Sequence, residues 1–248
     1  MKPIQVLSIG NSFSQDAHRY LHDLARHEGM AIETVNLFIG GCSLERHYQN
    51  MITGSREYTL EINGHRADGF FCSIDEALFA RQWDVITLQQ VSGLSIQKDS
   101  YDPYLKALAA HVRNRCPNAK LLLHQTWAYE SGSDRIRNCG FNTYSEMFSC
   151  VKICYEEAAQ QICADGIIPC GEAFHIAIEA GISNLHRDTF HASYGVGRFL
   201  LALVWYMYLT GNNASKTDYY PFDEPVAQAE YDQIMSIALQ TLSGAKPL

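Results

Sequence analysis

The feature that most constrains the fold is a regular alternation of short apolar runs with longer segments of helical period. The apolar runs predict strands over residues 4–9, 32–38, 84–88, 119–124 and 166–169. Runs that are apolar almost throughout are typical of parallel strands buried on both faces of a sheet. The sequence therefore predicts an α/β protein, built as a three-layer α/β/α sandwich around five parallel strands.

Between these runs, apolar residues recur at the spacing of amphipathic helices. The predicted helices cover residues 16–28, 103–115, 144–163, 193–210 and 226–242. The fourth of these segments is apolar nearly all round, which predicts a buried helix. Its longest purely apolar run has eleven residues and is too short to span a bilayer.

Two stretches interrupt the alternation. Asn63-Gly64 lies between extended runs and predicts a β-hairpin. The polar stretch at 129–145 predicts a long loop after the fourth strand, which is a natural place for substrate contacts. Because no repeat, low-complexity segment or linker divides the sequence, we expect residues 1–248 to form one domain.

Charge and composition argue against several classes of function. The formal net charge is −8 and no cluster of Lys and Arg is present, which argues against binding to nucleic acids or anionic membranes. The eight cysteines include no C-x-x-C pair, so we expect core thiols in a reducing compartment.

No signal peptide precedes the first strand. This predicts a cytoplasmic protein, or a secreted or periplasmic one if an export signal has been removed.

The stretch Ile-Gly-Asn-Ser-Phe-Ser places Ser12 in a turn between the first strand and a helix. Ligands of open parallel sheets bind beyond the carboxyl ends of the strands, so this turn is a favoured position for a reactive hydroxyl group. Backbone N–H groups at the start of the helix could stabilise an oxyanion. The alternative is structural, because Ser12 with Gln15 matches a capping box and Ser14 could equally be the N-cap.

A serine nucleophile needs a base and a group that orients the base. Asp188 and His191 stand three residues apart before the predicted buried helix, and this spacing lets the carboxylate lie beside the imidazole. His186 is close enough to be a rival base. The alternative for this pair is a capping aspartate and an ordinary loop histidine.

Candidate oxyanion donors follow the second and third strands. Gly40-Gly41 could bring a backbone N–H group close to an oxyanion, because glycine has no side chain in the way. Gln89 and Gln90 end the third strand, where a side-chain amide could donate a further hydrogen bond. All of these positions lie at the edge of the sheet that also carries Ser12, whereas accidental motifs would scatter over both edges.

These motifs together resemble the SGNH hydrolases, the GDSL-like esterase superfamily, and in particular a bacterial subgroup with a Gly-Asn-Ser-Phe opening. The resemblance covers nearly the whole chain and implies a flavodoxin-like sandwich of SGNH type. It implies Ser12 as the nucleophile, Asp188 as the orienting group and His191 as the base. It also implies backbone oxyanion donors at Ser12 and Gly41.

The chain departs from the family pattern in the third block. The family has Gly-x-Asn-Asp there, and the Asn side chain completes the oxyanion hole, whereas this chain has Leu-Gln-Gln-Val-Ser-Gly. Gln90, or else Gln89, is the expected replacement, and without either the hole has two donors. Asn11 stands where the family has Asp, and we expect Asn11 to contact the substrate.

The resemblance implies ester hydrolysis through an acyl-enzyme, with no metal and no organic cofactor. The expected substrate carries a small acyl group such as acetyl, with a carbohydrate as one option for the alcohol. Trp127 and Tyr129 follow the fourth strand and could form an aromatic platform for a sugar ring. The alternative places Trp127 in the core.

Two other functions stay open at this point. A metal hydrolase would use His18 and His22, one helical turn apart, with Asp16 and His27 nearby. The adjacent Glu of the His-Glu-x-x-His motif is missing. The non-enzyme alternative is a catalytically weak or inactive carbohydrate-binding protein on the same fold. Motifs of α/β-hydrolases and of nucleotide-binding loops are absent from the sequence.

Overall fold

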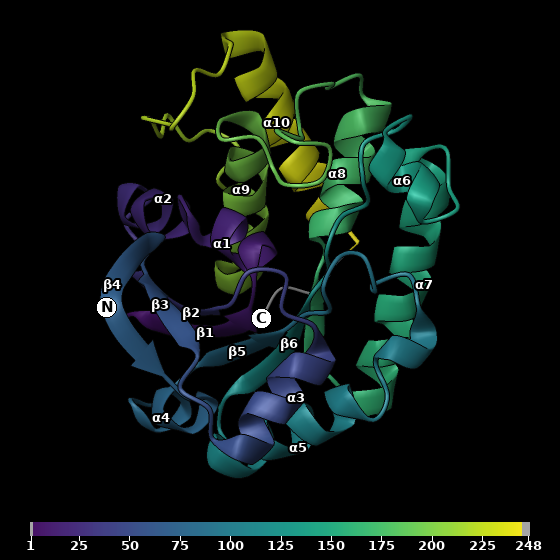
Figure 1. Ribbon diagram of the computed structural model, residues 1–248. Coiled ribbons are helices and arrows are strands. Elements are labelled where there is room, and N and C mark those ends of the chain that lie inside the picture. The colour runs from purple at the N-terminus through teal and green to yellow at the C-terminus, as the bar shows by residue number, and fades with distance from the viewer. Residues whose placement is uncertain (1, 245–248) are drawn as a thin grey trace.

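A single seven-stranded sheet forms the centre of the protein in the computed structural model, which describes residues 2–244 (Figure 1). The strands are β1 (Ile4–Gly10), β2 (Ile32–Phe38), β3 (Tyr58–Ile62), β4 (His65–Cys72), β5 (Val85–Leu88), β6 (Lys120–His124) and β7 (Gly166–Ile168). Their order across the sheet is β4-β3-β2-β1-β5-β6-β7. Strands β1, β2, β5, β6 and β7 are parallel and correspond to the five apolar runs. The predicted α/β sandwich is confirmed.

The predicted number of strands was too low by two, because the hairpin at Asn63-Gly64 also joins the sheet. Strand β3 pairs antiparallel with β2, and β4 pairs with β3 as the outer edge. Asn63 and Gly64 have positive φ angles of 52° and 76°, as a two-residue hairpin turn requires. Most side chains of β4 are exposed, so this strand lacks the apolar run that marks the inner strands.

The helices are α1 (Ser12–His18), α2 (Leu21–His27), α3 (Leu44–Thr53), α4 (Ile74–Phe79), α5 (Tyr104–Arg115), α6 (Asp134–Asn138), α7 (Tyr144–Ile162), α8 (Cys170–Glu179), α9 (Val196–Thr210) and α10 (Gln228–Leu242). A 3₁₀ turn covers Lys98–Ser100. Helices α1, α2, α8, α9 and α10 pack on one face of the sheet and α3, α4 and α5 on the other (Figure 1). Helix α7 packs between α5 and α8 beside β7.

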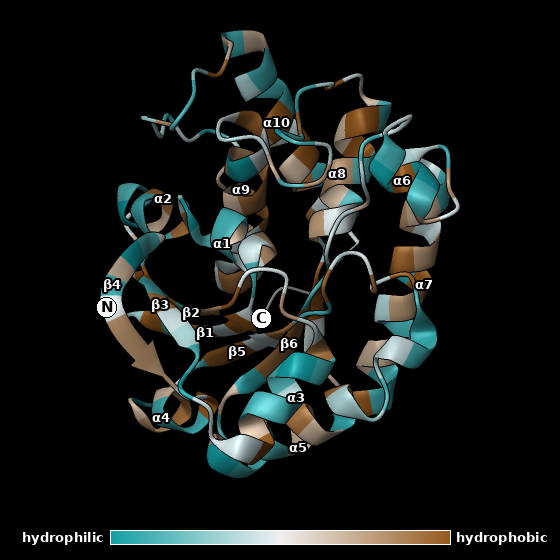
Figure 2. Cartoon of the chain, in the orientation of Figure 1, coloured by the Kyte–Doolittle hydropathy of each residue, from teal (hydrophilic) through white to brown (hydrophobic). Residues whose placement is uncertain are grey.

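All five predicted helices are present, although the first is divided into α1 and α2. Helices α3, α4, α6 and α8 were not predicted, because each has ten residues or fewer and its apolar pattern is brief. Helix α9 is buried from Val196 to Leu209, as its sequence indicated, and its brown ribbon runs through the interior in Figure 2. None of the helices in the described part of the chain is long and apolar enough to cross a membrane.

The loops with the predicted site residues leave the sheet at one edge. Gly10 at the end of β1 lies beside Phe38 at the end of β2, and Leu88 at the end of β5 lies beside Leu123 of β6. Because these strands are parallel, the turns that follow them lie next to one another. The fold therefore brings together segments that are far apart in the sequence, at the edge where parallel sheets bind ligands.

Candidate active site

Ser12 is the first residue of helix α1, and it does not cap that helix. The N-cap is Asn11, whose Oδ1 accepts a hydrogen bond from Phe13 N at 3.0 Å. Ser14 Oγ accepts a hydrogen bond from Asn11 N at 3.1 Å and completes the capping box. The structural alternatives, with Ser12 or Ser14 as the N-cap, are therefore wrong. The hydroxyl group of Ser12 is left for another partner.

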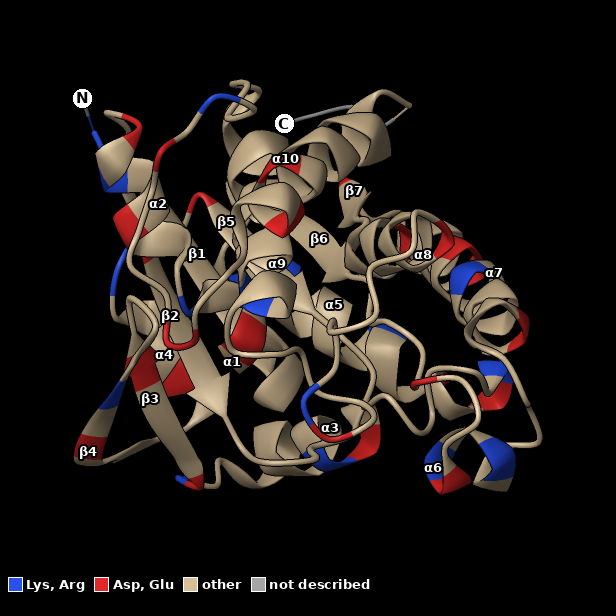
Figure 3. Ribbon diagram, turned by 90° about the horizontal axis from the view of Figure 1, so that it is seen from above, with Lys and Arg blue, Asp and Glu red and all other residues tan. Residues whose placement is uncertain are grey.

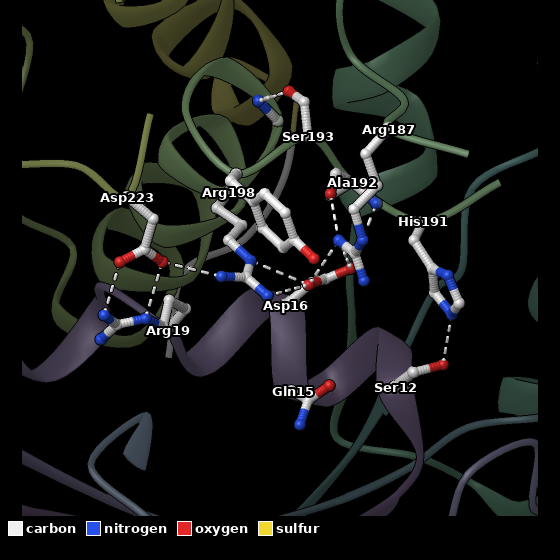
Figure 4. Close-up of polar contacts among 12 residues, drawn as sticks. Ser12, Gln15, Asp16, Arg19, Arg187, His191, Ala192, Ser193, Arg198 and Asp223 are labelled. Atoms are coloured by element: carbon white, nitrogen blue, oxygen red, sulfur yellow. Dashed lines mark hydrogen bonds and ion pairs between the residues drawn. The ribbon is translucent and has the colours of Figure 1, made fainter. Parts of the chain in front are cut away.

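That partner is His191. Ser12 Oγ lies 2.8 Å from His191 Nε2, a contact drawn in Figure 4, and His191 Nδ1 lies 2.7 Å from Asp188 Oδ2. When Nδ1 donates to the carboxylate, Nε2 is an acceptor that can take the proton of Ser12. Asp188 Oδ1 accepts a second hydrogen bond from His191 N at 2.9 Å, which fixes the turn between the two residues. The structure thus brings all three predicted residues together.

The surroundings of Asp188 favour its ionised form. Partial burial opposes the charge, but the hydrogen bonds from the His191 side chain and backbone outweigh this effect and lower the pKa of Asp188 below its usual value of 3.8. An ionised carboxylate at this position holds the imidazole ring in one orientation. It also stabilises the imidazolium cation that forms when the ring takes up a proton.

A buried carboxylate ties the helix of Ser12 to the loop of His191. Asp16, one turn after Ser12, has no exposed surface and accepts a hydrogen bond from Ala192 N at 3.1 Å. It also accepts hydrogen bonds from Arg187 Nη1 and Arg198 Nε, both at 2.9 Å. Figure 4 shows the two guanidinium groups around the carboxylate. Since Ala192 follows His191, these contacts hold the imidazole in place relative to the serine.

The charges around Asp16 form a network that reaches the surface. Arg198 Nη1 donates to Asp223 Oδ2 at 2.8 Å, and Asp223 also pairs with Arg19 at 2.6 Å. Burial raises the pKa of Asp16, while the charges of Arg198 and Arg187 act in the opposite direction. Two arginines with several hydrogen bonds give this buried carboxylate the compensation that a buried charge requires.

A cavity of about 450 Å³ lies in front of Ser12 and His191. The turns after β1 and β2 and the loops after β5 and β6 all contribute to its wall, and so does the histidine loop. Its other lining residues are Asn11, Phe13, Gly40, Gly41, Val91, Ser92, Gly93, Tyr129, Arg135 and Phe190. The wall is apolar beside the serine and offers few side-chain polar groups there, which suits a small acyl group.

Two backbone N–H groups near the serine are available as donors. Gly41 lines the cavity in a left-handed conformation with φ of 63°, which glycine adopts without strain. Among the described residues, neither Ser12 N nor Gly41 N has a hydrogen-bond partner. Unpaired backbone N–H groups at a cavity are the type of group that can stabilise an oxyanion.

The two glutamines hold loops together and do not line the cavity. Gln90 Oε1 accepts a hydrogen bond from Leu44 N at 3.0 Å, and Gln90 Nε2 donates to Ser100 O at 2.9 Å. Gln89 Nε2 donates to Asn11 Oδ1 at 2.7 Å. Both side chains are buried. These contacts correct the expectation that one of the two glutamines replaces the family asparagine as an oxyanion donor.

Asn11 and Trp127, both expected to contact the substrate, have structural roles, and Asn11 also lines the cavity. Asn11 Nδ2 donates to Cys42 O at 3.0 Å and joins the turn after β1 to the loop after β2. Trp127 is fully buried, stacks on Phe13 and donates to Phe190 O at 2.7 Å. Both polar atoms of the Asn11 side chain thus have hydrogen-bond partners, and the Trp127 ring belongs to the core, which corrects the expectation that it forms a platform for a sugar.

Tyr129 does line the cavity, and its hydroxyl group lies 3.0 Å from Ser92 Oγ.

His186, the rival base, has a different partner from Ser12. Its Nε2 donates to Ala128 O at 3.0 Å, and burial lowers its pKa to about 4. A neutral histidine bonded to a backbone carbonyl group is not a base for Ser12.

The histidines of the metal-site alternative have separate partners. His18 is buried, with Nε2 at 3.0 Å from Ser8 Oγ, and His22 Nδ1 donates to a backbone carbonyl group of β2 at 2.7 Å. His27 pairs with Asp218 at 2.6 Å near the surface. Within residues 2–244, no group of three or more His, Cys, Asp or Glu side chains is arranged to hold a metal ion.

Sequence reasoning missed Asp16 as an anchor, and it missed Arg135 and Phe190 as cavity residues. Phe190 precedes His191 in the sequence, so its place beside the site could have been inferred. Arg135 lies in the polar stretch predicted to contact the substrate, but no local signal distinguishes it from its neighbours. The spacing from Ser12 to Asp16 indicates one turn of helix between them. The role of Asp16 could not be predicted, because its hydrogen-bond partners lie in segments far away in the sequence.

Comparisons with known proteins agree with this architecture. A family model described as "Domain of unknown function (DUF4886)" matches residues 5–238. A DUF4886 family protein from Bacteroides uniformis, known from a crystal structure, is 33% identical with a TM-score of 0.90, over 100% of this chain and 98% of that chain. Comparison with curated proteins gives no match.

Two more distant structures share the fold. A protein from Slackia heliotrinireducens, described as a candidate SGNH hydrolase, is 22% identical with a TM-score of 0.61, over 83% of this chain and 98% of that chain. A candidate GDSL-like lipase from Parabacteroides merdae is 14% identical with a TM-score of 0.55, over 81% and 93% of the two chains. The predicted resemblance to the SGNH hydrolases is confirmed at the level of the fold. Because the family model matches almost the entire sequence, the chain belongs to the DUF4886 family, and it has the fold of the SGNH hydrolases.

Proposed function

We propose that the protein is a serine hydrolase that acts on ester bonds. The observation that carries this proposal is the continuous chain of contacts from Ser12 Oγ to His191 Nε2 at 2.8 Å and from His191 Nδ1 to Asp188 Oδ2 at 2.7 Å. A nucleophile, a base and an orienting carboxylate in this order form the minimum set for acyl transfer through a serine. The SGNH fold supports the same reaction class by analogy.

In the proposed reaction, Ser12 Oγ attacks the carbonyl carbon of the ester while His191 Nε2 takes the hydroxyl proton. The tetrahedral intermediate collapses, the bond from carbon to the alcohol oxygen breaks, and His191 gives the proton to the leaving alcohol. Water then attacks the acyl-enzyme with His191 again as the base. The acid leaves and the hydroxyl group of Ser12 is restored.

The oxyanion of the intermediate would be stabilised by Ser12 N and Gly41 N. Both groups are backbone donors with fixed positions, so they need little reorganisation during the reaction. With Gln89 and Gln90 committed to loop contacts, these are the donors that the fold provides. This hole lacks the side-chain donor that the asparagine of the SGNH family supplies. The loss of one donor costs on the order of 2.7–4 kcal/mol of transition-state stabilisation, so we expect a lower kcat than with a complete hole.

The size and lining of the cavity support a small acyl group such as acetyl. A volume of about 450 Å³, with Phe13, Val91 and Phe190 in the wall, accommodates a short acyl chain and part of an alcohol. The carbohydrate option depended on an aromatic platform of Trp127 and Tyr129, and although Tyr129 lines the cavity, the Trp127 ring is buried. The proposal is therefore limited to small acyl esters.

The test is hydrolysis of a short-chain p-nitrophenyl ester by the parent protein and by the variants Ser12→Ala and His191→Ala. We expect both substitutions to lower kcat by at least about 10³-fold, because each removes a member of the triad. Matched controls are Ser236→Ala and His65→Ala, which change exposed residues outside the site. A chelator should leave the rate unchanged.

The outcome that contradicts the proposal is an inactive parent protein, or an active one whose rate survives both triad substitutions. The alternative is then a binding protein on the same fold. The geometry of the two glutamines, which leaves the hole with backbone donors alone, is the observation in favour of that alternative. Ligand binding that is unchanged in Ser12→Ala, without turnover in the parent protein, would support it.

A further inference from the structure

The cavity in front of the proposed triad carries a positive charge in a strongly acidic protein. The chain has a formal net charge of −8, yet no Asp or Glu lines the cavity in the described part of the chain. Arg135 is the lining residue with a permanent charge. An acid-free wall with one guanidinium group attracts anions and repels cations.

The side chain of Arg135 is held by aromatic rings instead of by an acidic partner. Its guanidinium carbon lies 3.7 Å from the centre of the Phe190 ring and 5.6 Å from the centre of the Tyr129 ring. Among residues 2–244, Arg135 forms no ion pair, whereas Arg137 on the same short helix pairs with Asp134. Figure 3 shows this mixture of basic and acidic residues on α6. A stacked guanidinium keeps its in-plane N–H groups available for a carboxylate.

This charge lies close to the reacting groups. The Phe190 ring that supports Arg135 also contacts the His191 imidazole, with 3.7 Å between the two ring centres. The guanidinium group and the proposed base are therefore both in contact with the same ring, that of Phe190. An ester bound at Ser12 would place groups a few atoms from its carbonyl carbon within reach of Arg135.

We propose that Arg135 determines specificity by binding a carboxylate group that the ester substrate carries near its scissile bond. This inference rests on the proposed esterase function and names the substrate class for the same site. The guanidinium group forms a charge-assisted, bidentate pair with the carboxylate at the mouth of the cavity. The Phe190 and Tyr129 rings hold it in position, so little side-chain freedom is lost on binding.

The test compares esters that have the same shape and differ in charge. For a charge on the acyl side, the pair is mono-4-nitrophenyl succinate and 4-nitrophenyl 4-methylpentanoate. For a charge on the alcohol side, the pair is 4-carboxyphenyl acetate and 4-carbamoylphenyl acetate. The readout is the ratio of kcat/KM for the anionic ester to that for the neutral ester, after subtraction of spontaneous hydrolysis.

We expect the parent protein to prefer the anionic member of one pair by about 10-fold or more, since a charge-assisted pair of this kind exceeds the energy of one tenfold step. Arg135→Gln should lower that ratio about 10-fold, chiefly through a higher KM. Arg135→Lys should retain part of the preference, because the charge remains and the planar group is lost. High ionic strength should lower the ratio of the parent protein.

The matched control is Arg137→Gln, which removes an equal charge two residues away on α6 and should leave the ratio unchanged. A parent ratio near unity for both pairs overturns the inference, and so does a ratio that Arg135→Gln leaves intact. Failure of the esterase proposal is recognised separately. In that case the neutral esters are either not hydrolysed or are hydrolysed equally well by Ser12→Ala.

Discussion

At the scale of single residues, the hydroxyl group of Ser12 is available because its neighbours cap helix α1. Asn11 accepts the hydrogen bond from the first turn and Ser14 closes the capping box. A serine at the N-cap would direct its oxygen to the backbone of its own helix. Ser12 is one residue after the N-cap, and its oxygen contacts His191 instead. The same short segment therefore begins helix α1 and presents the proposed nucleophile.

Asp188→Asn should lower kcat by about 10²- to 10⁴-fold with a small effect on KM. The amide group of asparagine can face His191 Nδ1 as a donor, and the imidazole then presents a proton at Nε2 instead of a lone pair. The measurement is steady-state kinetics on a short-chain ester. Asp218→Asn is the control, since it disrupts an Asp–His pair with His27 at the surface. Parental kcat in Asp188→Asn would refute the role of this carboxylate.

Some residue roles could be read from the sequence and others could not. The spacing of Asp188 and His191 was informative because their contact is local. The two glutamines follow one strand side by side, and their partners, such as Leu44 and Asn11, come from other loops. Trp127 follows a strand end in the sequence, but the chain there still runs through the core. These side chains are buried by segments that are distant in the sequence, and a local sequence pattern does not predict such tertiary packing.

At the scale of elements, the site depends on the attachment of the histidine loop to helix α1. Asp16→Asn should lower the free energy of unfolding by about 3–5 kcal/mol, because Arg187 and Arg198 would keep their buried charges without the carboxylate. The measurement is urea denaturation. We also expect a lower kcat at temperatures where the variant is folded, since Ala192 N loses its acceptor and His191 loses its fixed position.

The control for this prediction is Asp223→Asn, at the outer end of the same network. Asp223 is 30% exposed and pairs with Arg19 and Arg198, so its loss should cost about 1 kcal/mol or less. Equal destabilisation by the two substitutions would contradict the importance of the buried carboxylate. An unchanged kcat in folded Asp16→Asn would show that the loop is held by other contacts.

The hairpin of β3 and β4 is a second element with a tight constraint. Gly64 has a φ of 76°, and a Cβ atom there would lie 2.6 Å from Arg19 O and 2.8 Å from His18 O. Gly64→Ala should therefore cost about 2–4 kcal/mol, measured as a lower urea midpoint. Gly69→Ala is the control, because its φ is 82° but its surroundings are open, and about 1 kcal/mol is expected. Equal effects would mean that the turn can move away from α1.

The elements that the sequence predicted are those whose environment is uniform along their length. Strands β1, β2, β5 and β6 and helix α9 are buried over most of their length, so their apolar runs are nearly continuous. The hairpin turn was correctly predicted from Asn63-Gly64, but its place in the sheet was not, because β4 exposes most of its side chains. An edge strand is held by backbone hydrogen bonds to one neighbour, which leave little trace in the sequence.

At the scale of the whole molecule, one hydrophobic core surrounds several buried polar groups. His18, His47 and His124 have almost no exposed surface, and burial lowers the pKa of each to about 3. Their usual pKa is 6.5, so the unfolded chain takes up protons at pH values where the folded protein keeps these rings neutral. Folding stability that depends on the neutral rings is present above pH 6.5 and is lost as the pH falls toward 3.

The buried ring of His186, whose pKa is lowered to about 4, behaves in the same way in this range. We therefore expect the free energy of unfolding to fall by about 4–5 kcal/mol between about pH 6 and about pH 5, since each of these four imidazoles contributes about 1 kcal/mol per pH unit. The window lies above the pKa of ordinary carboxyl groups, so exposed aspartate and glutamate side chains contribute little there. Urea denaturation at both pH values measures the slope. His47→Gln should reduce the slope by about a quarter, whereas His65→Gln, a change at an exposed site on β4, should not. A stability that is constant across this window would mean that the buried rings can take up protons within the folded protein.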